Sequence, residues 1–270
     1  MCPLKANSQS IMWNSAWRLL IRLFVWPYGS ETFSINIPNG DFMDAQYWLK
    51  KWNDESIGFH QADVNKRLKT FWPEVVVEPV NDSKPPCVFV PLCGKSLDML
   101  WLQQQGLHVL GVELSEKAAV AFFDENQLTY EHHTEGKFAV YSGTGKASGI
   151  RILVGDFFSL TLADISGCHY LYDRASLIAM NREMRADYTK HLSAICVTGL
   201  RGLLLAISYD QSKMQGPPFS VSDRFVHENL GKFFDIQELA HFGGPERVGN
   251  LGARGLETLD ERVYLLVRKS

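Results

Sequence analysis

The feature that most constrains the fold is a short apolar run that leads into a glycine and then into an amphipathic segment. Residues 87–102 read CVFVPLCGKSLDMLWL. This pattern predicts a buried strand over 87–91, a turn at Gly94 and a helix over 96–105. Shortly afterwards the run GVELSE predicts a second strand, which covers 108–113. Strands separated by a helix are typical of a parallel sheet.

Gly94 and Glu113 together predict a binding site for an adenosine-containing cofactor. Because Gly94 has no side chain, it lets a ligand approach the edge of the sheet. A carboxylate about 20 residues after such a turn can accept hydrogen bonds from ribose hydroxyls. A simple turn that serves packing and binds nothing would produce the same local pattern.

The residues around Gly94 narrow the choice of cofactor. A dinucleotide-binding fold uses G-x-G-x-x-G, but Gly94 is followed by Lys95, Ser96 and Leu97. The GKS triplet also occurs in the Walker phosphate-binding loop, whose earlier glycine would fall on Phe89. Without these glycines the backbone amides cannot cradle a phosphate. S-adenosylmethionine, which contains adenosine and no phosphate, is therefore the cofactor that fits best.

Composition and charge limit the number of domains and the kinds of partner that the chain can have. The 270 residues suit one large domain or two small ones, and a hydrophobic content of 46% supports a substantial core. The net charge of −3 and the lack of a long basic block predict that nucleic acid is not a partner. The 5 cysteines are odd in number and widely spaced, which favours reduced thiols in a cytoplasmic protein. Because no cysteine or histidine spacing is typical of a zinc site, we expect no metal.

The N-terminal part of the chain differs from the rest. Residues 11–28 are apolar and aromatic, but two internal arginines make them a poor transmembrane helix. We predict that residues 1–42 are a disordered or non-native extension and that residues 43–270 form the domain. The reason is that MDAQYWLKKW, which starts at Met43, predicts a helix capped by Asp44. An amphipathic helix on a membrane surface is the alternative for 11–28, although we expect no stable membrane association.

The remaining chain alternates between apolar strands and amphipathic helices. Further strands are predicted at 150–154, 169–172, 202–208 and 262–268, helices at 44–52, 62–71, 115–126, 174–197 and 222–230, and loops at 80–86, 141–149 and 210–220. Near-continuous apolar strands indicate a mainly parallel sheet covered on both faces. We therefore expect the ligand at the carboxyl ends of the strands, where the strand order reverses.

The polar and aromatic residues at these strand ends form the candidate site. Glu113 ends the second strand. Asp156 and Phe157 follow the third, where a carboxylate can bind an adenine amine and a ring can cover the base. A helix cap and a core phenylalanine are the alternative for this pair. Asp173 and Arg174 follow the fourth strand, and a surface ion pair is the alternative there.

The order of these motifs resembles the thiopurine S-methyltransferase family in its bacterial form. The similar stretches are YWLKKWNDESIGFHQ (47–61), VFVPLCGKSLDMLWL (88–102), GVELSEKA (111–118), GDFF (155–158), LYDRASLIAM (171–180), SYDQSKMQGPPF (208–219) and YLLVRK (264–269). The resemblance spans 43–270. It implies an α/β, Rossmann-like class I S-adenosylmethionine-dependent methyltransferase. Such a fold has a seven-stranded, mostly parallel sheet with helices on both faces, a reversed final strand and an N-terminal helical cover.

The same resemblance implies roles for individual residues. The implied cofactor contacts are Trp52, Leu92, Glu113, Asp156, Phe157 and Arg174. Phe59 is implied on the substrate side. Arg174 is also implied to be catalytic, where it would orient a thiolate acceptor while Asp173 holds the arginine. Arg247 or Arg254 would contact substrate as well, and the sequence does not choose between them.

The activity that the resemblance implies is methyl transfer to the sulfur of aromatic or heterocyclic thiols such as thiopurines, in a cytoplasmic monomer. Methylation of selenium or tellurium compounds in detoxification is one alternative. A non-catalytic protein that binds S-adenosylmethionine is another. An NAD-linked oxidoreductase is disfavoured, because the second and third glycines of its motif are missing.

Overall fold

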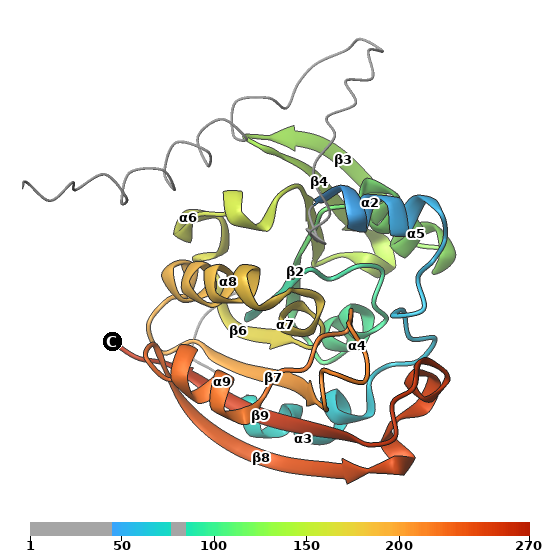
Figure 1. The fold of residues 1–270 in the computed structure, drawn as a ribbon. Coiled ribbons are helices and arrows are strands. Elements are labelled where there is room, and N and C mark those ends of the chain that lie inside the picture. The colour runs from blue at the N-terminus through green and yellow to red at the C-terminus, as the bar shows by residue number, and fades with distance from the viewer. Residues whose placement is uncertain (1–44, 77–84) are drawn as a thin grey trace, which may run out of the picture. The chain divides into compact units, whose positions relative to one another are not determined.

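The computed structural model describes residues 45–76 and 85–270, which form a sheet covered by helices on both faces (Figure 1). The extension predicted at 1–42 and the helix cap predicted at Asp44 lie outside the described residues. Within the described ranges, no helix is long and apolar enough to cross a membrane.

Five parallel strands form the centre of the sheet. They are β1 (Cys87–Pro91), β2 (His108–Glu113), β5 (Ile150–Val154), β6 (Cys168–Asp173) and β7 (Arg201–Ser208). Their order is β5-β2-β1-β6-β7, and every neighbouring pair among them is parallel. The chain runs outward from β1 through β2 and then returns to the other side of β1 with β6. The strand order therefore reverses at β1, where a ligand is expected in folds of this kind.

Antiparallel strands extend the sheet at both sides. They are β3 (Thr129–Glu135), β4 (Phe138–Thr144), β8 (Phe234–Gly244) and β9 (Leu259–Arg268). The predicted reversal of the last strand is confirmed, because β9 pairs antiparallel with β7. The predicted count of seven strands is wrong, since the described residues form a 9-stranded sheet. The β3–β4 hairpin accounts for the difference: β3 is polar and exposed, so its sequence lacks the apolar signal of a strand.

Helices cover the two faces of the sheet in two groups. The N-terminal group comprises α2 (Ala45–Asn53), α3 (Lys66–Val75), α4 (Asp98–Gln104) and α5 (Glu116–Glu125). The second group comprises α6 (Leu162–Ile165), α7 (Ser176–Ala179), α8 (Arg182–Ile195) and α9 (Asp223–Asn229). A single helix was expected near 174–197. It is instead two helices, because Asn181 caps α8 by accepting a hydrogen bond from the amide of Met184.

The core lies on both faces of the central strands. Val88 and Val90 pack with α3, α4 and α5, whereas Phe89 between them packs with the helices of the second group. Alternate side chains of a strand point to opposite faces, so both faces are filled by apolar contacts. Polar chemistry is consequently left to the edge of the sheet where the strands end.

Candidate functional site

Glu113 is a buried carboxylate at the carboxyl end of β2. It is 6% exposed, and its two oxygens accept hydrogen bonds from the amides of Gly94 at 2.9 Å and Ser115 at 2.8 Å. Burial raises the pKa of Glu113, and these amides oppose the shift by stabilising the charged form. A carboxylate can accept about four hydrogen bonds in all, so Glu113 retains acceptor capacity for a ligand hydroxyl.

The loop after β1 has a backbone that few side chains tolerate. Leu92 adopts a φ of 48° and Gly94 a φ of 53°, both in the left-handed region. A Cβ added to Gly94 would lie 3.3 Å from the ring of Trp52 in α2. The indole therefore packs directly over the loop, and Trp52 is almost fully buried there. This arrangement fixes the shape of the sheet edge at the reversal of strand order.

Phe59 joins Trp52 to a small aromatic cluster. Its ring centroid lies 5.5 Å from that of Trp52 and 5.5 Å from that of Trp48, with an edge-to-face orientation in both pairs. Phe59 is nevertheless 42% exposed, which is unusual for a large apolar side chain. The cluster can therefore offer an aromatic face to a flat ligand.

Arg174 forms an ion pair with a residue that the sequence analysis did not single out. Its Nε lies 3.2 Å from Oδ2 of Asp98, at the start of α4. Asp98 is 1% exposed and also accepts hydrogen bonds from the hydroxyl of Tyr172 and the backbone amide of Asn65. This network fixes a cation beside the ends of β1 and β6, with its guanidinium side chain 18% exposed.

Asp173 does not hold Arg174, which corrects the role expected for it. Its oxygens accept hydrogen bonds from the amide of Ser176 and from the hydroxyl of Tyr188 instead. Burial raises the pKa of Asp173. The physical reason for the correction is that Arg174 lies in a bend just past the end of β6 and pairs with Asp98, whereas Asp173, the last residue of the strand, is engaged by Ser176 and Tyr188. Asp173 thereby ties β6 to α7 and α8.

Asp156 and Phe157 make the contacts of a cap and of a core residue. Asp156 accepts a hydrogen bond from the amide of Phe158 at 2.9 Å and so caps a short 3₁₀ turn. Phe157 is buried with its ring centroid 4.8 Å from that of Tyr188. Asp156 remains exposed at the carboxyl end of β5, beside Glu113 of β2, since Gly155 donates its amide to the carbonyl of Glu113.

Comparison with known proteins decides the family. The sequence profile described as Thiopurine S-methyltransferase (TPMT) matches residues 43–269. The chain belongs to the thiopurine S-methyltransferase family. A thiopurine S-methyltransferase of Azotobacter vinelandii is 45% identical over 84% of this chain and 100% of its own length. Another of Pseudomonas fluorescens is 46% identical over 82% of this chain and 98% of its own length.

The fold is also that of solved S-adenosylmethionine-dependent methyltransferases. One from Anabaena variabilis superposes with a TM-score of 0.57 at 16% identity, and the match covers 88% of this chain and 100% of that structure. As a member of the thiopurine S-methyltransferase family, the protein is an S-adenosylmethionine-dependent methyltransferase that acts on a small molecule. The predicted family, fold class, cofactor and enzyme class are thus confirmed.

Two residues of the site escaped the sequence analysis. Asp98 follows the GKS triplet at a helix start, where an aspartate usually indicates only a favourable helix terminus. His60 follows Phe59, and its pKa is lowered by burial and then by the positive charge of Lys95, with a further contribution from Arg174. The side chain of His60 is thus neutral at neutral pH and lies within electrostatic reach of two cations.

Arg247 and Arg254 lie in the segment between β8 and β9. Because β8 and β7 each pair antiparallel with β9, this segment is at the edge where β7 ends. Arg254 donates to the carbonyl of Pro217 at 2.7 Å, in the loop after β7. The guanidinium of Arg247 lies 5.3 Å from the ring centroid of Phe242. Both arginines are exposed.

Proposed function

We propose that this enzyme transfers a methyl group to the sulfur of an aromatic or heterocyclic thiol such as a thiopurine. The observation that carries this proposal is that the fixed cation Arg174 acts electrostatically on His60, whose chain neighbour Phe59 has a half-exposed ring. A flat ring and a localised negative charge are the two features of an aromatic thiolate. The relatives from Azotobacter vinelandii and Pseudomonas fluorescens both carry the name thiopurine S-methyltransferase, which supports the same acceptor.

The residues at the ends of β1 and β2 fit S-adenosylmethionine. Glu113 keeps acceptor sites for ribose hydroxyls, and Gly94 leaves the loop without a side chain at the closest approach. Leu92 belongs to that loop and Trp52 packs over it, so both would line the methionine part of the cofactor. We assign adenine to the end of β5, where exposed Asp156 has one oxygen engaged by the amide of Phe158. Phe157 is buried there and would support the base from below.

Arg174 is assigned to the acceptor. S-adenosylmethionine supplies a methyl group that is activated by the adjacent sulfonium charge. A guanidinium beside the acceptor site favours the thiolate over the thiol and orients its sulfur, and Asp98 fixes the direction of that guanidinium. An aromatic thiol ionises readily, so the site needs no strong general base. Positioning of the two reactants in line can contribute up to ~7–11 kcal/mol to the lowering of the barrier.

The chain is further proposed to work as a cytoplasmic monomer without a nucleic-acid partner. The net charge of −3 supports the lack of a nucleic-acid partner, and the odd number of widely spaced cysteines supports a reducing compartment. Light scattering coupled to gel filtration measures the mass in solution, and a dimer mass would contradict the monomer.

Calorimetric titration with S-adenosylmethionine tests the cofactor site. The parent protein should bind, and Glu113→Ala should bind at least about tenfold more weakly, which corresponds to about 1.4 kcal/mol. Glu135→Ala is the matched control, because Glu135 is exposed on β3 and pairs there with Arg151. Equal weakening in both variants would argue against a site at Glu113.

Turnover of a thiopurine tests the acceptor site separately. Arg174→Ala should lose most of its kcat/KM for the thiol while S-adenosylmethionine still binds, and Arg174→Lys should recover part of the loss. Full turnover by Arg174→Ala would show that Arg174 does not orient the acceptor. No turnover of any aromatic thiol by the parent protein, despite cofactor binding, would reject the proposed acceptor class.

A further inference from the structure

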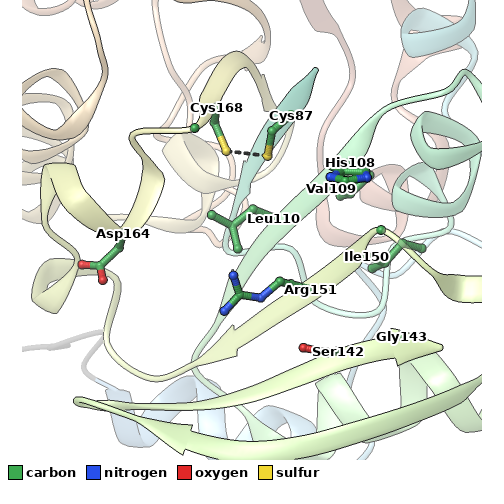
Figure 2. Close-up of a pocket in the computed structure, with 12 residues that line it drawn as sticks. Cys87, His108, Val109, Leu110, Ser142, Gly143, Ile150, Arg151, Asp164 and Cys168 are labelled. Carbon is green, nitrogen blue, oxygen red and sulfur yellow. Dashed lines mark hydrogen bonds between the residues drawn. The ribbon is translucent and has the colours of Figure 1, made fainter. Parts of the chain in front are cut away.

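A cavity lies at the opposite edge of the sheet from Glu113 and Arg174. It has a volume of about 420 Å³ and is lined by residues at the amino ends of the parallel strands (Figure 2). Cys87 begins β1, His108 begins β2, Ile150 begins β5 and Cys168 begins β6. Because parallel strands start at one edge and end at the other, this cavity is separate from the proposed methyl-transfer site.

Cys87 and Cys168 face each other at one end of this cavity. Figure 2 shows their sulfur atoms directed toward one another, and the Sγ atoms are 2.7 Å apart. The two residues are register partners on adjacent strands. The register shifts immediately afterwards, because Val88 pairs with Tyr170. Register partners on neighbouring strands place their Cβ atoms on the same face of the sheet, within the range that a disulfide can span.

The two thiols differ in access to the cavity. Cys168 is buried, and its contact with Cys87 together with burial raises the pKa of its thiol. Cys87 is only partly buried and lines the cavity. The sulfur of Cys168 is thus held in contact with that of Cys87 inside the fold. The partly exposed sulfur is the one that a reagent in the cavity reaches first.

We propose that Cys87 and Cys168 form a redox-active dithiol that hydroperoxides oxidise to a disulfide. In the first step the thiolate sulfur of Cys87 attacks the peroxide O–O bond, which yields a sulfenic acid and, after protonation of the leaving oxygen, an alcohol or water. In the second step the sulfur of Cys168 displaces the hydroxyl group of that sulfenic acid. An S–S bond forms, and water leaves with the proton of Cys168.

The sum of the two steps is two thiols and one hydroperoxide converted to one disulfide, one water and one alcohol. The two sulfur atoms lose two electrons and the peroxide gains them. A cellular thiol can reverse the reaction by thiol–disulfide exchange. A reversible disulfide of this kind is compatible with a reducing compartment, where transient disulfides are usually redox-responsive.

The contrast with the other described cysteines supports this assignment. Cys93 and Cys196 are both buried, and burial raises the pKa of each thiol. Among the described cysteines, the cavity is lined by Cys87 and Cys168 and not by Cys93 or Cys196 (Figure 2). Reaction should therefore be selective for the pair at the amino ends of β1 and β6.

Peptide mapping of the folded, full-length protein after hydrogen peroxide treatment tests the proposal. The expected product is a peptide pair that joins Cys87 to Cys168, with two hydrogens fewer than the reduced pair and full reversal by dithiothreitol. Cys168→Ser should instead accumulate a sulfenic acid at Cys87 that dimedone traps. Cys196→Ser is the matched control and should still form the disulfide.

Two outcomes would overturn the proposed dithiol. A map in which Cys87 and Cys168 remain reduced while another cysteine oxidises would do so, as would linkage of Cys87 to any other cysteine as the main product. The map of the unsubstituted protein is decisive even if a variant fails to fold. Peptide mapping does not require methyl transfer, so its result is independent of whether the protein methylates the proposed thiol acceptor.

Discussion

Arg174 is paired with Asp98, 3.2 Å away at the start of α4, and not with its sequence neighbour Asp173. The pair joins the end of β6 to the helix that follows the β1 loop. That loop also contains Gly94, whose amide contacts Glu113. One set of contacts thus links the residues assigned to the acceptor with those assigned to the cofactor.

Asp98→Asn should disturb both stability and the acceptor site. The variant removes a buried charge that serves Arg174 and accepts from Tyr172. We expect a loss of about 2 kcal/mol in the free energy of unfolding, in the range for hydrogen bonds to charged groups. We expect kcat/KM for the thiol to fall about tenfold or more while S-adenosylmethionine binding changes little. Urea unfolding, steady-state kinetics and calorimetry measure the three quantities.

Glu228→Gln is the matched control for Asp98→Asn. It breaks the pair with Arg224 on α9, where both side chains are largely exposed. The loss in the free energy of unfolding should stay below about 0.5 kcal/mol, and kcat/KM for the thiol should be unchanged. If Asp98→Asn loses stability but retains kcat/KM for the thiol, Asp98 supports the fold and does not position Arg174.

Gly94→Ala should weaken the cofactor site through both backbone strain and contact. The residue has a φ of 53°, and the new Cβ would meet Trp52 at 3.3 Å. The strain alone should cost about 1 kcal/mol of stability. Gly136→Ala measures the effect of backbone strain alone, because Gly136 has a φ of 59° with nothing within 4 Å of a new Cβ. Calorimetry should show weaker S-adenosylmethionine binding in Gly94→Ala alone. Equal affinity in the two variants would contradict a close approach at Gly94.

Phe59→Ala should affect the thiol more than the cofactor. Its ring is half-exposed against Trp48 and Trp52, which suits a flat acceptor. Loss of a stacking face should cost about 1 kcal/mol, so KM for an aromatic thiol should rise about fivefold. Leu162→Ala is the control, since Leu162 is 49% exposed at the start of α6. Unchanged KM in Phe59→Ala would remove Phe59 from the acceptor site.

Asp173 should make stability fall as the pH rises above the ordinary carboxyl range. Burial raises the pKa of Asp173 in the folded protein. Between the unfolded pKa and this higher folded pKa, the folded state binds more protons than the unfolded chain, so rising pH favours unfolding in that window. Asp173→Asn lacks this contribution and keeps an acceptor for Ser176. The free energy of unfolding of the parent minus that of the variant should therefore decrease with rising pH. Urea titrations from mildly acidic to neutral pH measure it, and an increase would refute the assignment.

Local patterns in the sequence were sufficient to predict where the central strands lie. The runs at 87–91, 108–113 and 150–154 were each predicted with the bounds that the structure has. They are buried on both faces, so their apolar signal is continuous and strong. The edge strand β3 was missed because it is polar and depends on pairing with β4, so it has no apolar pattern of its own.

Motifs that are contiguous in the chain were enough to predict the family and the cofactor, which the comparisons confirm, and to propose the strand ends at which the site is expected. Only the tertiary structure decided that Asp98 serves Arg174 and that Cys87 meets Cys168. Their separations are 76 residues (174 − 98) and 81 residues. Pairings across such distances depend on strand order and register, which a local pattern of side chains does not encode.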